Sequence, residues 1–224
     1  TLLWTIEGVT LFWIGRTRGA AFYEKLAFPL LSIAFVSIIH DWSVQLSNLD
    51  INIYTPFSNI NFYSSLAVTL LFALVIALSI SKRYSAPEFK ATYYSVFAQY
   101  FLPLMFAIIA YFTFATEIYS YWTQQYSASM VLMPTSDPEV QTQLFNASLL
   151  HYKTIWLINY SLLFIGIITY LTSLSKKNEQ LGKILLTLTL VTIGIFLGRG
   201  LHLFSELRTL YLDHDTTFEI TRNS

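Results

Sequence analysis

Long apolar segments alternate with short polar ones along the chain. A helix rises about 1.5 Å per residue, so about 20 apolar residues cross the roughly 30 Å hydrocarbon core of a bilayer. The segments that are long enough to cross are residues 26–42, 61–81, 92–116, 154–174 and 184–205. A sixth apolar segment, residues 1–15, reaches only about 22 Å. The pattern predicts an all-α fold: a polytopic transmembrane helix bundle, with six spans that pair as three helical hairpins.

The predicted bundle occupies residues 1–212, and residues 213–224 form a polar C-terminal tail whose weak alternation slightly favours a strand over disorder. The first apolar segment begins without an initiator Met or a polar flank. Glu7 also interrupts the region where a signal peptide needs an apolar core. We therefore expect that residue 1 is not a natural N-terminus and that the chain is a piece of a longer multi-pass protein.

Basic residues are concentrated in three short segments between the apolar ones. Nine of the thirteen lie there: Arg16, Arg18, Lys25, Lys82, Arg83, Lys90, Lys176, Lys177 and Lys183. The loops between these segments are acidic and hold a single base, Lys153. Loops on the cytoplasmic side of membrane proteins are enriched in Lys and Arg. The pattern predicts a multi-pass protein of the cell membrane, with the longer loops 43–60 and 117–153 outside.

Composition narrows the possible chemistry. The chain is 54% hydrophobic and 12% charged, whereas roughly a quarter of the residues of soluble domains are charged. It has no Cys, which excludes disulfides and Cys nucleophiles. Its four His show no metal-binding spacing. We predict no catalytic constellation, metal or cofactor. The expected partners are the lipid bilayer and other transmembrane helices, of the same longer chain or of partner subunits, and not nucleic acid.

Three polar residues are predicted within the membrane: Glu7, Gln99 and Asn159. Glu7 lies nine residues before Arg16, and Gln99 lies nine residues after Lys90 on an oppositely directed helix, so the two share one depth. Ionisable groups at that depth are costly. Glu7 is therefore either a proton or cation site, or a neutral acid hydrogen-bonded to Gln99 or a backbone carbonyl; exposure to water is a third interpretation. Asn159 occupies the place in its helix that Glu7 has in the first, which hints at an internal repeat.

A second polar group is predicted at the outer end of the bundle. Its members are His40, Asp41, His151, Arg199, His202 and Glu206. The last three share one helix face at i, i+3 and i+7. One interpretation is a site for an anionic headgroup or substrate, anchored by Arg199. The other is a set of ordinary snorkelling side chains and helix-end ion pairs.

Two further features concern helix packing. Gly194 and Gly198 form a small-xxx-small pattern, which lets another helix approach closely. Pro103 lies inside a predicted span and is a candidate for a kink, because proline frees a backbone carbonyl. Pro29 falls in the first turns of its span, where we expect little effect.

Several motifs resemble a known family. A Trp-x-x-Glu-Gly-x-x-Leu-x-Trp-x-Gly-Arg pattern runs through Trp4, Glu7, Gly8, Leu11, Trp13, Gly15 and Arg16. It is similar to the recurring unit of a large family of bacterial multi-pass membrane proteins, domain of unknown function 2339. The later Asn159-Tyr-Ser-Leu-Leu-Phe and Leu203-Phe-Ser-Glu-Leu-Arg208 are similar to Bacteroidota members. The resemblance covers most of the chain and implies an architecture within a longer protein of the bacterial inner membrane. It implies no activity, because the family has no established chemistry.

Three classes of function fit these observations. The first, which we favour, is a non-enzymatic subunit or scaffold of a membrane assembly. The second is a transporter or lipid-handling protein with Glu7 at mid-membrane. The third is an intramembrane enzyme that uses the outer polar group, including Arg199, His202, Glu206 and His40.

Overall fold

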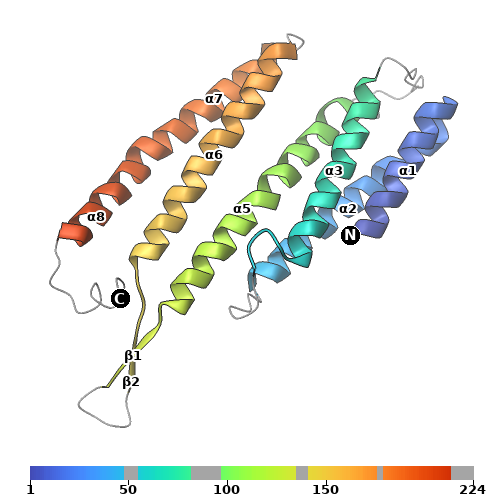
Figure 1. The fold of residues 1–224 in the computed structure, drawn as a ribbon. Coiled ribbons are helices and arrows are strands. Elements are labelled where there is room, and N and C mark those ends of the chain that lie inside the picture. The colour runs from blue at the N-terminus through green and yellow to red at the C-terminus, as the bar shows by residue number, and fades with distance from the viewer. Residues whose placement is uncertain (48–54, 82–96, 135–140, 176–178, 213–224) are drawn as a thin grey trace. The chain divides into compact units, whose positions relative to one another are not determined.

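A computed structural model describes residues 1–47, 55–81, 97–134, 141–175 and 179–212 (Figure 1). The predicted loop segments between these ranges and the tail 213–224 lie outside the described residues. The helices are α1 (Leu2–Arg18), α2 (Ala21–Ser47), α3 (Ile60–Ile80), α5 (Leu102–Ala128), α6 (Ser148–Ser175), α7 (Glu179–Ile195) and α8 (Leu201–Leu212). Two π-helical segments, η1 (Phe97–Phe101) and η2 (Phe196–Gly200), precede α5 and α8. The predicted all-α fold class is confirmed.

Five of the described helices are long and apolar enough to cross a membrane, which confirms a multi-pass membrane protein. They are Ala21–Ser47, Ile60–Ile80, Phe97–Ala128, Ser148–Thr172 and Leu185–Thr209. Helix α1 is shorter, with 17 residues that extend about 25 Å. It runs antiparallel to α2, because Thr1 Oγ1 lies 2.6 Å from Ser37 Oγ while the other end of α1 contacts Glu24. Helix α1 therefore covers most of the length of α2.

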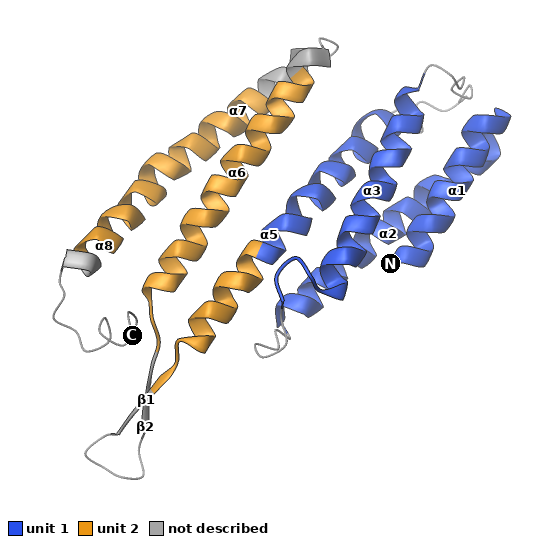
Figure 2. Ribbon diagram, viewed as in Figure 1, with its two compact units in different colours: residues 1–117 blue, residues 118–224 orange. Residues whose placement is uncertain are grey.

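The chain divides into two compact units, residues 1–117 and 118–224 (Figure 2). In the first unit the apolar faces of α1, α2, α3 and α5 meet in one core, whose fully buried members include Phe12, Leu31, Phe72 and Ile109. Buried hydroxyls add polar contacts: the Trp42 indole donates to Ser65 Oγ at 2.9 Å, and Thr69 Oγ1 lies 3.0 Å from Thr113 Oγ1. These hydrogen bonds fix the packing of α2 and α5 against α3.

The longer outer loop holds more structure than predicted. Helix α5 continues to Ala128, twelve residues past the predicted end of its span at 116. Two strands then pair antiparallel, β1 (Val131–Pro134) and β2 (Gln141–Leu144), with Val131 opposite Leu144. The extension of α5 is held by aromatic stacking: the ring centroids of Trp122 and Tyr152 are 5.5 Å apart. Polar and aromatic side chains after an apolar segment are compatible with a loop and also with a helix that continues into the membrane interface. Hydropathy therefore placed the C-terminal end of α5 too early.

Pro103 is the second residue of α5, a helix that follows η1 directly. A proline has no N–H to donate to the preceding turn. In this chain the preceding turn is the π-helical segment η1 and not a regular α-helical turn. The kink at Pro103 stays a prediction, and Pro29 lies inside a continuous α2.

The predicted topology has a direct test, because a chain without Cys accepts single reporter cysteines. Ser127 ends α5 on the predicted outer side, and Ser85 lies in a predicted cytoplasmic loop outside the described residues. In intact cells an impermeant maleimide should label Ser127→Cys and should label Ser85→Cys only after permeabilisation. The reverse pattern would invert the topology.

Candidate functional site

Glu7 lies near the middle of α1, on the face turned away from the rest of the unit. The buried face of α1 carries Thr5, Gly8, Val9, Phe12 and Gly15, whereas Glu7 is exposed. A Cβ at Gly8 would lie 3.1 Å from the Leu31 side chain. Glu7, the residue before Gly8, is therefore level with the middle of α2.

The predicted hydrogen bond between Glu7 and Gln99 is not formed. Gln99 lies in η1 and is exposed, as Glu7 is, and no contact between the two exists among the described residues. The pairing was predicted from depth alone. It is not formed because the direction in which each side chain points around its helix also matters, and both side chains are exposed. Asn159 lies in the second unit, where its amide donates to the Ile155 carbonyl of its own helix at 3.0 Å.

The glycines that allow close helix packing are not the predicted pair. A Cβ added at Gly194 or Gly198 would meet nothing within 4 Å. A Cβ at Gly15 would lie 2.9 Å from the backbone nitrogen of Glu24. Gly8 and Gly15 are seven residues apart, two helical turns, and thus share the α1 face that contacts α2. No described helix covers the face of Gly194 and Gly198, so their contact stays a prediction for a helix of a longer chain or of a partner subunit.

A buried ion pair joins α1 and α2 where these helices meet at their predicted cytoplasmic ends. Arg16 Nε lies 2.6 Å from Glu24 Oε1, and the two side chains are 5% and 0% exposed. The guanidinium of Arg16 also lies over the Phe12 ring, 5.2 Å from its centroid. Each residue also has a local explanation: Arg16 belongs to a basic segment, and Glu24 is in the first turn of α2, where a carboxylate complements the helix dipole. The signal that was missed is Gly15 beside Arg16, because only a glycine brings the two backbones this close.

A second buried carboxylate lies at the opposite end of the first unit. Glu117 accepts hydrogen bonds from the Phe57 backbone N–H at 2.8 Å and from the Asn59 amide at 3.1 Å. Asn59 in turn caps α3 by accepting from the Phe62 N–H at 2.8 Å. Phe57 has a φ of 57°, a left-handed conformation that is uncommon for a non-glycine residue. Glu117 therefore holds the turn that starts α3.

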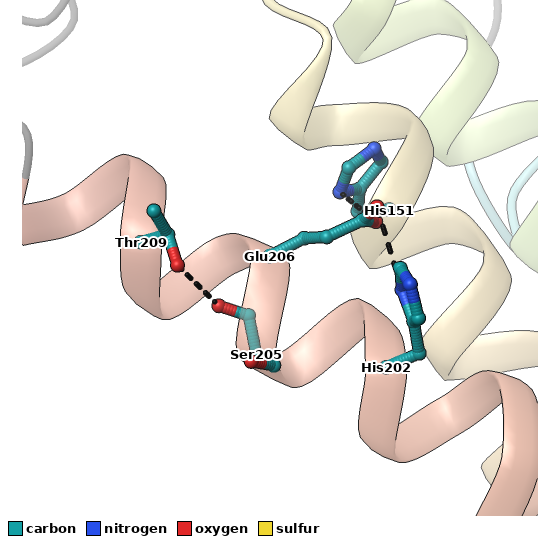
Figure 3. A pocket seen from close by; sticks show the side chains of 5 residues that line it. All are labelled: His151, His202, Ser205, Glu206 and Thr209. Atoms are coloured by element: carbon teal, nitrogen blue, oxygen red, sulfur yellow. Dashed lines mark hydrogen bonds and ion pairs between the residues drawn. The ribbon is translucent and has the colours of Figure 1, made fainter.

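Part of the predicted outer polar group comes together in the second unit. Glu206 lies between two imidazoles: its Oε2 is 3.7 Å from His151 Nδ1, and its Oε1 is 3.4 Å from His202 Nδ1 (Figure 3). His151 is in the first turn of α6, and the other two residues are one turn apart on α8. With Ser205 and Thr209 they line a cavity of about 430 Å³.

The other predicted members of this group are elsewhere. Arg199 is exposed in η2 and does not line the cavity. His40 and Asp41 belong to the first unit, where His40 Nδ1 lies 3.9 Å from Asp41 Oδ1 and both side chains are exposed. The interpretation as a site for an anionic ligand depended on Arg199, and no arginine is among the described residues that line the cavity. Across the described residues, no group of His, Asp and Glu side chains is arranged to hold a metal ion.

Lysine and aromatic side chains lie close to the cavity on α6. Lys153 Nζ stands 4.3 Å from the centre of the Tyr119 ring and 3.5 Å from Thr123 Oγ1. Tyr152 stacks on Trp122. Amphipathic rings of this kind concentrate at the membrane–water interface, so we expect the cavity to lie at headgroup depth.

Comparison of the chain with protein-family models, characterised proteins and solved structures found no match. The resemblance to domain of unknown function 2339 therefore stays a prediction.

Proposed function

We propose that this chain is a non-enzymatic subunit of a larger membrane assembly and that α1 presents Glu7 to another transmembrane helix. The observation that carries the proposal is the exposure of Glu7 on an otherwise apolar helix face at the level of Leu31. The partner helix carries a hydrogen-bond donor at the same depth. It belongs either to a longer form of this chain or to a separate subunit.

The energetics favour such a partner over lipid. An ionised carboxylate at the centre of a membrane helix costs about 2.5–3.5 kcal/mol even on lenient insertion scales. Around Glu7 the exposed side chains are apolar, among them Leu3 and Ile6. The hydroxyl of Thr10 is already used, because it donates to the Ile6 carbonyl at 2.8 Å. A donor from a neighbouring helix removes the cost and fixes the register of the two helices.

The transporter hypothesis receives less support from the same residue. A coupling carboxylate works inside a bundle or beside a water-filled cavity, whereas Glu7 is on the outer surface of its own unit. Lipid handling remains the second candidate, and it is favoured by a different observation: the cavity at His151, His202 and Glu206. An enzymatic role is the least supported, because none of the described hydroxyls that line the cavity is hydrogen-bonded to a histidine that could act as its base.

Photo-crosslinking in native membranes tests the proposal. A benzoyl-phenylalanine in place of Ile6, beside Glu7, should crosslink to protein. The same residue in place of Ile33 should not, although Ile33 is equally exposed and lies at a similar depth on α2. Glu7→Leu should abolish the crosslink from position 6, and Glu7→Gln should preserve it, because an amide still hydrogen-bonds.

The mass of the crosslinked product separates the two sources of the partner helix, since an intramolecular product keeps the mass of one chain. Equal crosslinking from positions 6 and 33, or a crosslink that survives Glu7→Leu, would contradict the proposal. Loss of an ion gradient in cells with Glu7→Gln, without loss of the assembly, would favour transport instead.

A further inference from the structure

The cavity between α6 and α8 has the character of a ligand site, and this is independent of the role of Glu7. Four of its five lining residues share one face of α8: His202, Ser205, Glu206 and Thr209 stand at i, i+3, i+4 and i+7. His151 completes the wall from α6 (Figure 3). Two helices of one unit therefore contribute polar groups to a space of about 430 Å³.

The lining is rich in acceptors. Among the described residues that line it, Glu206 is the one acid, and none is Lys or Arg. Carboxylate and hydroxyl oxygens accept hydrogen bonds, and an uncharged imidazole accepts at one ring nitrogen. The Thr209 hydroxyl donates its proton to the Ser205 carbonyl at 3.1 Å, so its oxygen is left as an acceptor. A ligand that donates several hydrogen bonds and carries positive charge complements this set.

The carboxylate of Glu206 lies near two imidazoles, but at distances too long for strong hydrogen bonds. Its contacts to the two imidazole nitrogens, at 3.4 and 3.7 Å, are longer than the roughly 2.7–2.9 Å of a charge-assisted hydrogen bond. His151 Nδ1 is buried and makes no hydrogen bond. An ammonium group between these atoms would supply the missing donors.

We propose that this cavity binds a primary ammonium group, with Glu206 as counter-ion and the imidazoles and hydroxyls as further acceptors. The aromatic pairs and Lys153 beside it place the cavity at headgroup depth on the predicted outer side. Lys153 is two residues from His151 in the sequence, and its side chain does not line the cavity. Its ammonium contacts Tyr119 and Thr123 of α5, so Lys153 does not compete with the ligand for Glu206. An ethanolamine-type phospholipid headgroup carries a primary ammonium beside a phosphate, and a soluble primary amine carries the ammonium alone.

Native mass spectrometry of the protein from nanodiscs tests the proposal. The discs contain equal parts of phosphatidylethanolamine, phosphatidylcholine and phosphatidylglycerol. The wild-type protein should retain phosphatidylethanolamine over the other two, because a quaternary ammonium donates no hydrogen bond and the glycerol headgroup carries no cation. Glu206→Gln should reduce this preference about tenfold, the loss expected for one charge-assisted hydrogen bond.

The chain offers a matched control. Asp41 and His40 form an exposed acid–imidazole contact without a cavity, so Asp41→Asn should keep the lipid preference. Circular dichroism and elution volume establish that Glu206→Gln remains folded. Competition by free ethanolamine in lipid-free detergent would assign the site to the amine itself, and its failure to compete would assign it to the whole lipid headgroup.

Equal retention of the three lipids by the wild-type protein, together with no binding of ethanolamine, would overturn the proposal. So would stoichiometric binding of Zn²⁺ that Glu206→Gln abolishes while lipid retention stays unselective. Neither result depends on whether Glu7 contacts a partner helix, so this site and the proposed assembly role can fail separately.

Discussion

Replacing Glu24 with Ala should destabilise the first unit more than any other single truncation of a charged residue in it. Arg16 would stay buried beside Phe12 without its counter-ion. Removing one member of a buried ion pair typically costs about 3–5 kcal/mol. The expected result is a fall of several degrees in the thermal unfolding midpoint in detergent, with a loss of helical signal at temperatures where the wild type is folded.

Two controls separate the pair from a general effect of losing a carboxylate. Asp41→Ala removes an exposed acid from the same helix and should change the midpoint little. In the double variant Arg16→Met with Glu24→Leu, no charge is left buried at this contact, and the midpoint should recover toward the wild type. An additive double variant would mean that the two side chains are not coupled, and an unchanged midpoint in Glu24→Ala would contradict the buried pair.

Hydropathy was sufficient to predict the fold class. The fold class depends on the lengths of the apolar segments, and these lengths can be counted in a single sequence. The spans at 61–81 and 154–174 lie within helices whose bounds are Ile60–Ile80 and Ser148–Ser175, apart from one residue at the end of the first. The end of α5 was misplaced because its last turns are stabilised by aromatic stacking between segments, not by hydrophobicity. The hairpin of β1 and β2 gave no usable signal, since each strand has only four residues.

The candidate sites show where one sequence is insufficient. Periodicity placed His202 and Glu206 on one face, and similar height brought His151 to them. The same reasoning failed for Glu7 and Gln99, because equal depth says nothing about which way a side chain points around its helix. Arg16 and Glu24 escaped notice because each had a sufficient local explanation, as a positive-inside charge and as a helix-dipole partner. Only the packing of α1 on α2 shows that both are buried.

The glycines of α1 give the sharpest test of that packing, through a graded series of alanine substitutions. A Cβ at position 15 would lie 2.9 Å from the backbone nitrogen of Glu24, and backbone cannot rotate away. A Cβ at position 8 would meet the Leu31 side chain at 3.1 Å, which can shift by a few tenths of an ångström. Overpacking a tight contact costs about 1–3 kcal/mol, so Gly15→Ala should lower the unfolding midpoint clearly and Gly8→Ala less.

Gly198→Ala is the matched control, because its Cβ would enter open space. Alanine is also the better helix former, by about 1 kcal/mol relative to glycine, so this variant should be neutral or more stable. The measurement is the thermal midpoint of the purified protein in one detergent, with the three variants side by side. The order Gly15, Gly8, Gly198 from most to least destabilised follows from the contacts of α1 with α2. If Gly198→Ala were the most damaging, the tight helix contact would lie on α7 and η2, as the small-xxx-small pattern alone suggested. Equal midpoints for Gly15→Ala and the wild type would mean that α1 is not seated on α2 at Glu24, and the burial of Arg16 would fail with it.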